Sequence, residues 1–165
     1  MYTIRTATKA DASALGCLHY TCWCETYAGQ LDPGYLSKGS AEKSAAIFLR
    51  NGCRDMFLAE ENGSPIGFCG YSISRDNDAA PTCGEIDGIY LLQRCQGYGL
   101  GTRLMDEACC QALRSRGCTE VTLWVLATNT KAIGFYEHCG FEADGSEQMV
   151  PYGQPVRLKR YRAAL

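Results

Sequence analysis

The chain has 165 residues, of which 46% are hydrophobic and 21% are charged, and its net charge is −2. This globular balance predicts one domain over residues 1–165, and the small net charge excludes a general attraction to nucleic acid or anionic lipid. No apolar run approaches the roughly 20 residues that cross a bilayer, and residues 1–9 contain no signal-peptide core, so we expect a cytoplasmic protein without a membrane partner.

The expected elements follow from polarity alternation in strands, apolar spacings of three and four in helices, and turn residues between them. In chain order they are a strand over 2–6, a helix capped by Asp11 and running toward Tyr27, a break over 29–34, a helix ending near Leu49, strands over 55–60 and 66–74 joined by Asn62-Gly63, a loop over 75–82, a strand over 85–91, a helix over 101–116, a strand over 119–126, a helix over 130–139, and strands over 141–145 and 156–162. The 101–116 helix has an apolar stripe of Leu100, Leu104, Ala108 and Ala112. This order predicts a mixed α/β fold.

Eleven cysteines are unusual for a chain of this length and raise the alternatives of a disulfide framework or a zinc site. Neither fits the spacing, because no Cys-x-x-Cys occurs and only two histidines could complete a zinc site. Most cysteines fall where a small core residue would serve, for example Cys69 and Cys118. We therefore expect reduced thiols that pack as small apolar side chains, and no metal.

A glycine-rich turn, Gln96-Gly97-Tyr98-Gly99-Leu100-Gly101, separates the 85–91 strand from the next helix. The first amides of a helix lack intrahelical acceptors and the helix dipole is positive there, so this turn is a candidate anion site. Its glycines would let the backbone approach a pyrophosphate closely. No Walker lysine follows, and the glycines recur at every second residue instead of as Gly-x-Gly-x-x-Gly. The spacing also fits Gln/Arg-x-x-Gly-x-Gly/Ala.

This last pattern resembles the signature of the GCN5-related N-acetyltransferase (GNAT) family, in which the turn binds the pyrophosphate of acetyl-coenzyme A. A second block, Asn129 to Phe141, is similar to the family's Asn-x-x-Ala-x-x-Phe-Tyr-x-x-x-Gly-Phe block. The expected elements match the family's topology over essentially the whole chain. The resemblance implies a single mixed, mostly antiparallel sheet of about seven strands, splayed between the fourth and fifth and flanked by about four helices.

The resemblance also implies a site for acetyl-coenzyme A as co-substrate. The strand before the turn would pair with the pantetheine arm through its backbone, and the turn would bind the pyrophosphate. The expected coenzyme-binding residues are Ile89, Tyr90, Leu91, Gln96, Gly97, Tyr98, Gly99, Leu100, Gly101, Thr102, Asn129, Lys131 and Tyr136. Asn129 could also cap a helix. Lys131, like Arg94, could instead be a solvated surface cation.

Acetyl transfer to an amine requires a neutral amine, stabilisation of charge on the thioester oxygen and a proton for the departing thiolate. Because alkyl amines have a pKa near ~10.4, few molecules are neutral at pH 7 and a base is valuable. Glu85 resembles the family's general base, acting directly or through a water, with Asp87 on the same face as its substitute. Tyr136 resembles the tyrosine that protonates the thiolate. The alternatives are an ion pair for Glu85 and core packing for Tyr136.

The segment 23–36 resembles the one that lines the acceptor groove in bacterial small-molecule members, including polyamine acetyltransferases. The expected substrate-binding residues are Trp23, Tyr27, Tyr35 and Glu85. Aromatic faces, together with the carboxylates of Glu25 and Asp32, would suit a cationic amine. Core packing is an equal alternative for the aromatic residues.

Three functions stay open at this stage. The first is an acetyl-CoA-dependent N-acetyltransferase whose acceptor, a primary amine of a small molecule such as a polyamine, attacks the thioester directly. The second is the same chemistry on a protein N-terminus or lysine, and the third is a non-catalytic acyl-CoA-binding module. Tyr136 and Glu85 argue against the third. The sequence specifies neither the acceptor nor the oligomeric state, and a homodimer is compatible with it.

Overall fold

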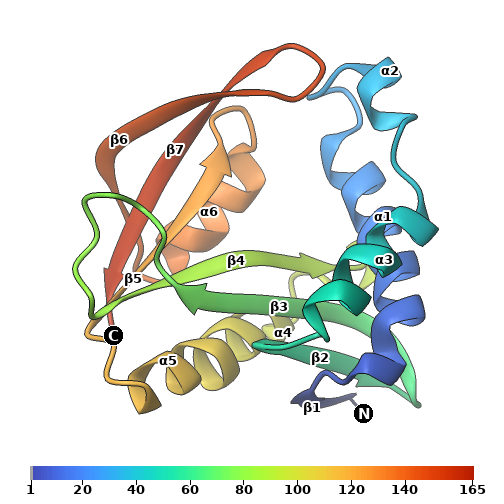
Figure 1. Ribbon diagram of the computed structural model, residues 1–165, viewed down its shortest axis with the longest axis horizontal. Helices are drawn as coiled ribbons and strands as arrows, with labels where there is room; N and C mark the ends of the chain where they lie inside the picture. The colour runs from blue at the N-terminus through green and yellow to red at the C-terminus, as the bar shows by residue number, and fades with distance from the viewer. Residues whose placement is uncertain (1) are drawn as a thin grey trace.

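The computed structural model describes residues 2–165 as a seven-stranded sheet with helices on both faces (Figure 1). The strands are β1 (Tyr2–Thr6), β2 (Met56–Glu61), β3 (Ser64–Ile73), β4 (Cys83–Leu91), β5 (Glu120–Leu126), β6 (Glu142–Pro151) and β7 (Pro155–Ala164). The helical segments are η1 (Lys9–Asp11), α1 (Ala12–Tyr27), α2 (Pro33–Leu36), α3 (Ala41–Asn51), η2 (Gln93–Cys95), α4 (Leu100–Thr102), η3 (Arg103–Cys110), α5 (Gln111–Ser115) and α6 (Thr130–His138).

The strand order in the sheet is β1-β2-β3-β4-β5-β7-β6. Neighbouring strands within residues 2–165 are antiparallel except β4 and β5, which are parallel. The predicted mixed, mostly antiparallel sheet is confirmed.

Strands β4 and β5 separate after a short paired segment. Their parallel register covers only Cys83–Glu85 against Glu120–Thr122, although β4 continues to Leu91 and β5 to Leu126. Beyond this segment β4 keeps its partner β3, and β5 keeps β7. In Figure 1, β5 rises away from β4. The predicted splay between the fourth and fifth strands is therefore confirmed, and it leaves one edge of β4 without a strand partner.

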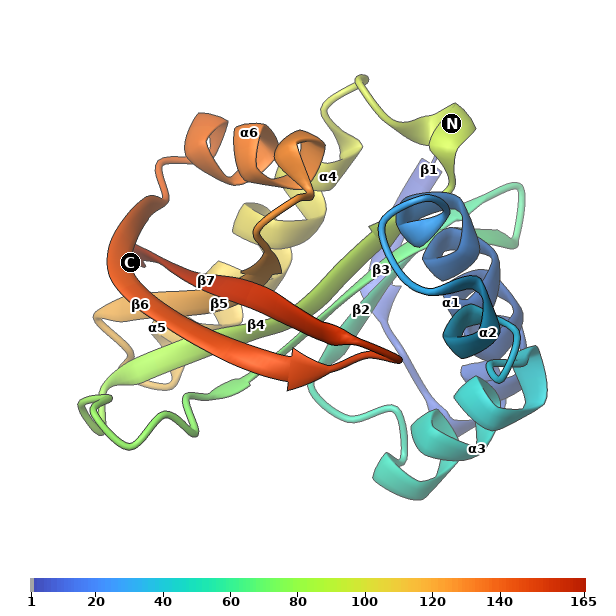
Figure 2. The same cartoon turned by 90° about the horizontal axis from the view of Figure 1, so that it is seen from above.

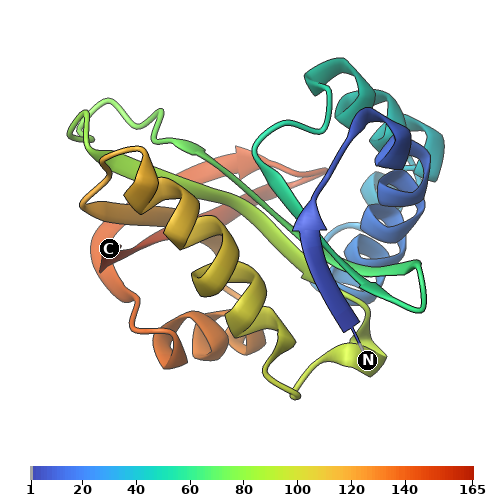
Figure 3. The same ribbon diagram turned by 90° about the horizontal axis from the view of Figure 1, so that it is seen from below.

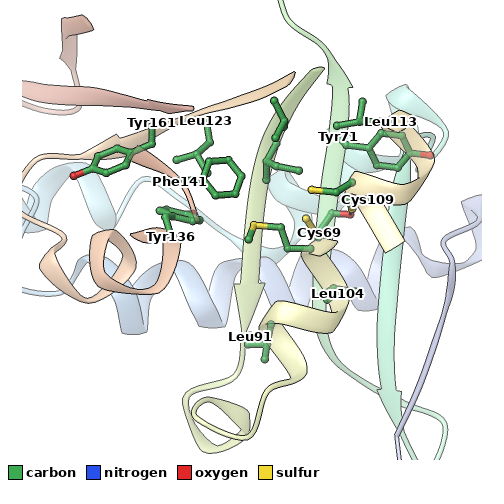
Figure 4. Close-up of a cluster of buried hydrophobic side chains, with 14 of the residues drawn as sticks. Cys69, Tyr71, Leu91, Leu104, Cys109, Leu113, Leu123, Tyr136, Phe141 and Tyr161 are labelled. Atoms are coloured by element: carbon green, nitrogen blue, oxygen red, sulfur yellow. The ribbon is translucent and has the colours of Figure 1, made fainter. Parts of the chain in front are cut away.

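Two helical layers cover opposite faces of the sheet. Segments α4, η3 and α5 form one continuous helix that crosses the face shared with α6 (Figure 3), while α1 and α3 lie on the other face (Figure 2). The main core joins the long helix to the sheet and α6, and Figure 4 shows Cys109 of that helix beside Cys69 of β3. A second core packs α1 against β2 and β3. A third joins Leu31 to β5 and β7.

The long helix differs from the prediction in which residues it buries. Leu100, Leu104 and Ala108 of the predicted stripe are buried, but Ala112 is partly exposed and Leu113 is fully buried in its place. The intervening segment η3 is π-helical. Its hydrogen bonds reach five residues instead of four, so the buried face advances by about one residue.

Three local expectations also need correction. Asp11 precedes α1, but its carboxylate does not cap that helix and instead binds Arg5 (2.8 and 2.9 Å) and the Thr8 amide (2.8 Å). The break over 29–34 ends in the short helix α2, which was not expected. Strand β6 extends to Pro151, whereas the prediction ended it at residue 145. Most of its residues are exposed, so its sequence lacks the alternation of polar and apolar residues by which strands are recognised.

All eleven cysteines of the chain are free thiols within the described residues. Those that are buried are Cys22, Cys53, Cys69, Cys83, Cys109, Cys110 and Cys118. All of them except Cys83 pack in the two larger cores as small apolar side chains, and Cys83 is fully buried on β4. Residues 2–165 include no cluster of three or more His, Cys, Asp or Glu side chains arranged to hold a metal ion. None of the described helices combines the length and the apolarity that a membrane crossing needs.

Candidate active site

The glycine-rich turn adopts a backbone conformation that requires glycine at two positions. Gly97 and Gly99 have φ angles of +85° and +77°, and Gly99 occupies the N-cap position of α4. Side chains with a Cβ rarely adopt this region. Gln96 Nε2 donates a hydrogen bond of 3.0 Å to the carbonyl of Leu91, which ties the turn to the end of β4.

The backbone amides of this turn are free. None of the six consecutive amides from Gly97 to Thr102 donates a hydrogen bond to another described residue, whereas the next amide, of Arg103, donates to Gly99 O at 3.1 Å. Free amides that precede and begin a long helix are a site for an anion. The turn therefore has the donors that a pyrophosphate would need.

The open edge of β4 also carries unpaired backbone groups. The amide of Leu92 donates to a β3 carbonyl at 3.0 Å, which sets the phase of the β3–β4 ladder. Because such a ladder alternates, Tyr90 also bonds toward β3, whereas Ile89 and Leu91 direct their N–H and C=O groups toward the splay. Among residues 2–165, only Gln96 bonds to one of these groups, the Leu91 carbonyl. The remaining groups could bind the amides of an extended ligand.

The Tyr136 hydroxyl has no protein partner at the same opening. Tyr136 lies on α6, is 8% exposed, and packs beside Phe135 and Phe141 with ring centroids 5.4 and 6.1 Å apart. Its hydroxyl makes no hydrogen bond to any residue in the range 2–165. Burial raises the pKa of Tyr136 well above its usual range, and the phenol of Tyr27, from the other face, adds to the shift. The phenol is therefore protonated at neutral pH.

Tyr90 places its ring on the side of the splay that faces α1. The ring lies on the α1 face, 4.9 Å from the His19 ring and 5.4 Å from the Phe68 ring. Burial raises the pKa of Tyr90 well above its usual value, and the nearby phenols of Tyr27, Tyr136 and Tyr152 contribute. The expectation that Tyr90 meets a ligand through its backbone is wrong, because its backbone pairs with β3.

Glu85 lies where β4 and β5 begin to separate. It is 8% exposed and accepts hydrogen bonds from the Arg75 amide (3.3 Å) and the Arg75 guanidinium (3.1 Å). The same guanidinium lies 2.6 Å from Asp87, so the prediction that both carboxylates share a face is confirmed. About 16 Å of strand separates Glu85 from Tyr90, and the structure does not bring Glu85 into contact with Tyr136. No sequence pattern indicated Arg75.

Aromatic rings from three segments gather on the α1 side of the splay, which we name the acceptor side because the acceptor is expected there. The Trp23 ring lies 6.0 Å from both Tyr27 and Tyr35, and Tyr35 stacks on Tyr152 of the β6–β7 turn at 5.7 Å. A Cβ on Gly153 would lie only 2.5 Å from Tyr35 Cβ, so this turn touches α2, as Figure 1 shows. The structure brings the three predicted aromatic residues together. It adds Tyr152, which no motif indicated.

Several predicted polar residues have structural partners. Glu25 accepts a hydrogen bond from the Gln93 amide (3.2 Å), and Asp32 accepts one from the Tyr35 amide (2.8 Å) as the N-cap of α2. Both carboxylates thus bind backbone amides, and contact with a cationic amine stays a prediction for both. Asn129 caps α6 through the Ala132 amide at 3.2 Å, so its capping role is confirmed.

The two candidate cations for phosphate differ in their surroundings. Arg94 forms an ion pair with Glu61 at 3.1 Å, and its side chain is 61% exposed. Lys131 is exposed on the first turn of α6 and forms no ion pair with a described residue. Both are surface cations, and contact with a phosphate stays a prediction.

Three comparisons relate the chain to known proteins. The profile of the Acetyltransferase (GNAT) family matches residues 19–141. A probable N-acetyltransferase of Mycobacterium tuberculosis is 34% identical over 147 residues, covering 86% of this chain and 80% of that protein. An aminoglycoside N(6')-acetyltransferase type 1 of Stenotrophomonas maltophilia is 29% identical over 160 residues, covering 93% of this chain and 94% of that protein. The crystal structure of the PaiA N-acetyltransferase of Thermoplasma acidophilum with coenzyme A matches with a TM-score of 0.81 at 21% identity, covering 100% and 99%.

Proposed function

This chain belongs to the acetyltransferase (GNAT) family, and we propose that it transfers the acetyl group of acetyl-coenzyme A to a primary amine of a small molecule. One observation carries the proposal. The free amides from Gly97 to Thr102, the unpaired edge of β4 and the unpartnered Tyr136 hydroxyl belong to one opening in the sheet.

The chain's own groups fit the coenzyme. The free amides of the turn suit its pyrophosphate, and the backbone of Ile89 and Leu91 suits the two amides of its pantetheine arm. The Thermoplasma relative was crystallised with coenzyme A, which supports this assignment. When bound, the coenzyme supplies the thioester whose acyl carbon the amine attacks.

Three groups of the chain would serve the transfer. The unpaired amide of Ile89 provides a hydrogen-bond donor for negative charge that develops on an acyl oxygen. Glu85 accepts a proton from the amine, through water given its distance along the strand. Tyr136 donates its hydrogen bond, and then its proton, to the departing sulfur. Burial raises the pKa of Tyr136, so the phenol keeps its proton until the thiolate forms.

The acceptor side favours a small molecule. The contact of Gly153 and Tyr152 with α2 bridges this side of the opening. A polypeptide that continues on both sides of its reactive residue needs an open groove, whereas one amine on a narrow stem does not. The faces of Trp23, Tyr27 and Tyr35 suit a cationic stem, as in a polyamine. The Stenotrophomonas relative is named for a small polyamino substrate, which supports this class.

A panel of acceptors tests the proposal through thiol release from acetyl-coenzyme A. It contains a linear polyamine, an aminoglycoside, simple alkyl amines, and peptides with a free N-terminus or a lysine. We expect release with one or more of the small amines and only background with peptides. Turnover restricted to peptides would assign a protein acceptor. Binding of acetyl-coenzyme A in calorimetry without any turnover would indicate a non-catalytic module and refute the proposal.

A further inference from the structure

Arg160 of β7 is a buried cation bound to three carboxylates from two separate segments. Its side chain is 4% exposed, and it lies 3.0 Å from Asp76, 2.6 Å from Asp78 and 2.6 Å from Asp144. A hydrogen bond of 2.9 Å to Ser146 adds a fourth partner. Asp76 and Asp78 belong to the 75–82 connection between β3 and β4, so Arg160 anchors that connection to the far half of the splayed sheet.

The anchor depends on the shape of the guanidinium. Nε donates to Asp144, Nη1 donates to both Asp76 and Asp78, and Nη2 donates to Asp78. The hydrogen bonds with Arg160 lower the pKa of Asp78 to about 2, so this carboxylate is charged throughout the neutral range. A lysine would keep the charge but lacks the planar fork that binds several carboxylates at once.

The anchored connection leads directly to Glu85. Asp76 also accepts hydrogen bonds from the Trp124 indole at 3.2 and 3.3 Å, so the residue after Arg75 is held from two sides. The backbone amide and guanidinium of Arg75 both bind Glu85. The Arg75 side chain is 70% exposed and would be mobile in solvent by itself. The sheet holds the backbone of Glu85 between β3 and β5, and Arg75 links its carboxylate to the connection that Arg160 anchors.

We propose that Arg160 is a positioning residue for Glu85, acting through Asp76, Asp78 and the backbone of Arg75. The inference rests on the proposed function, in which Glu85 accepts the proton of the amine. A displacement of about 1 Å at a reacting group can cost on the order of a hundredfold in rate. Loosening this connection should therefore slow proton removal and leave the coenzyme side of the site unchanged.

A first experiment does not depend on catalysis. Hydrogen exchange of the Arg75 amide, which donates to Glu85, and of the Ala79 amide, which donates to Asp76 O at 3.1 Å, is compared in wild type, R160Q and R160K. We expect both amides to exchange at least tenfold faster in R160Q and less so in R160K. The matched control is R157Q, on the same strand, whose side chain is 55% exposed and pairs with Glu147 at 3.5 Å, outside the Arg160 cluster. Unchanged exchange in a folded R160Q protein would overturn the proposal.

A second experiment tests the coupling to Glu85 by a double-mutant cycle. We expect R160Q to lower kcat/KM for the acceptor at least tenfold at pH 7, with less loss at high pH, where the amine is neutral without a base. R160K should recover part of the activity, and acetyl-coenzyme A affinity should stay within a few-fold. R160Q combined with E85Q should be no slower than E85Q, because both changes remove one function.

The outcomes separate the two proposals. Multiplicative losses in the double variant, or a pH-independent loss in R160Q, would overturn the positioning role while leaving N-acetyl transfer intact. If R160Q does not fold, R160K carries the same cycle. Wild-type protein that acetylates no acceptor would refute the proposed function, and the exchange of the Arg75 amide would still decide whether Arg160 holds the donor to Glu85.

Discussion

The open edge of β4 and the glycine-rich turn form the side of the splay that we assign to the coenzyme, named here the coenzyme side. The groups available to a ligand there are backbone amides and carbonyls between Ile89 and Thr102. On the acceptor side they are side chains from α1, α2, the 75–82 connection and the β6–β7 turn. A backbone surface is determined by local conformation, which neighbouring residues specify. A side-chain surface exists only after distant segments have packed together. The two halves of one site should therefore respond differently to substitution.

The largest expected effect is that of Tyr136→Phe. On the coenzyme side, Tyr136 is the side chain that we propose as the proton donor to the departing sulfur. The ring and its packing against Phe135 and Phe141 remain, while the only donatable proton is removed. We expect kcat to fall ten- to a thousand-fold, with Tm within a few degrees of wild type and acetyl-coenzyme A affinity within a few-fold. The deficit should shrink with acyl donors whose thiol is more acidic.

Tyr161→Phe is the matched control for that measurement. Tyr161 lies in the same core (Figure 4) and is 5% exposed. Its hydroxyl donates to Glu137 at 3.3 Å. Removing this hydroxyl should leave kcat unchanged. Wild-type turnover by Tyr136→Phe would mean that the thiolate leaves unassisted and that Tyr136 is a core residue.

Gly99→Val tests whether the coenzyme side works through its backbone. At φ +77° a β-branched residue is strained, although no atom lies within 4 Å of its Cβ position. We expect the Kd for acetyl-coenzyme A in calorimetry to rise at least tenfold, which is about 1.4 kcal/mol.

Gly117→Val separates strain from ligand binding. Gly117 has a φ of +85° and an equally open Cβ position, but it follows the C-terminal end of α5. The two variants should lose similar stability in urea denaturation, and only Gly99→Val should lose coenzyme affinity. Equal affinities in both folded variants would contradict the assignment of the turn to a pyrophosphate.

The same contrast explains what the sequence could predict. The turn from Gln96 to Gly101 and the cap at Asn129 were recognisable because each depends on residues within a few positions. The hydrogen bonds of Arg75 to Glu85 and the stacking of Tyr152 on Tyr35 join residues 10 and more than 100 positions apart, and no local pattern records them.

Glu25 and Asp32 show a second limit of sequence patterns. Each carboxylate accepts a hydrogen bond from a backbone amide, which no motif indicated, and contact with a cationic amine stays a prediction. A charge read from sequence does not show which donor it will satisfy. The extent of β6 was missed for a related reason, since solvent on both sides removes the alternation by which strands are recognised.

A moderate effect is expected on the acceptor side from Tyr152→Ala, compared with Tyr152→Phe. The alanine variant loses the ring that stacks on Tyr35 at 5.7 Å, whereas the phenylalanine variant keeps it. We expect Tyr152→Ala to raise KM for the amine several-fold, in line with a lost aromatic contact of about 1 kcal/mol, with KM for acetyl-coenzyme A unchanged. Tyr152→Phe should resemble wild type. Equal acceptor KM values in all three proteins would show that the stacked pair does not contact the acceptor.

The smallest expected effect concerns how α1 is held beneath the acceptor side. His19 Nδ1 lies 2.9 Å from Ser44 Oγ of α3, and its ring packs against Tyr90. Burial lowers the pKa of His19 below its usual 6.5. Between the two pKa values of His19, the unfolded chain therefore binds a proton at this residue and the folded chain does not. The contribution of neutral His19 to the free energy of unfolding is complete above about pH 6.5 and is lost as the pH falls toward the folded pKa.

We expect the free energy of unfolding in urea to decline between pH 7 and pH 5 in wild type, and to decline less in His19→Gln. The matched control is His138→Gln, because His138 is the chain's other histidine and is exposed on α6. It should keep the wild-type slope. Carboxylates such as Asp78, with its lowered pKa, lose their contribution only at more acidic pH and do not interfere in this window. If His19→Gln keeps the full slope, the ring takes up a proton without leaving its place between α1 and α3, and the acceptor side does not loosen as the solution is acidified.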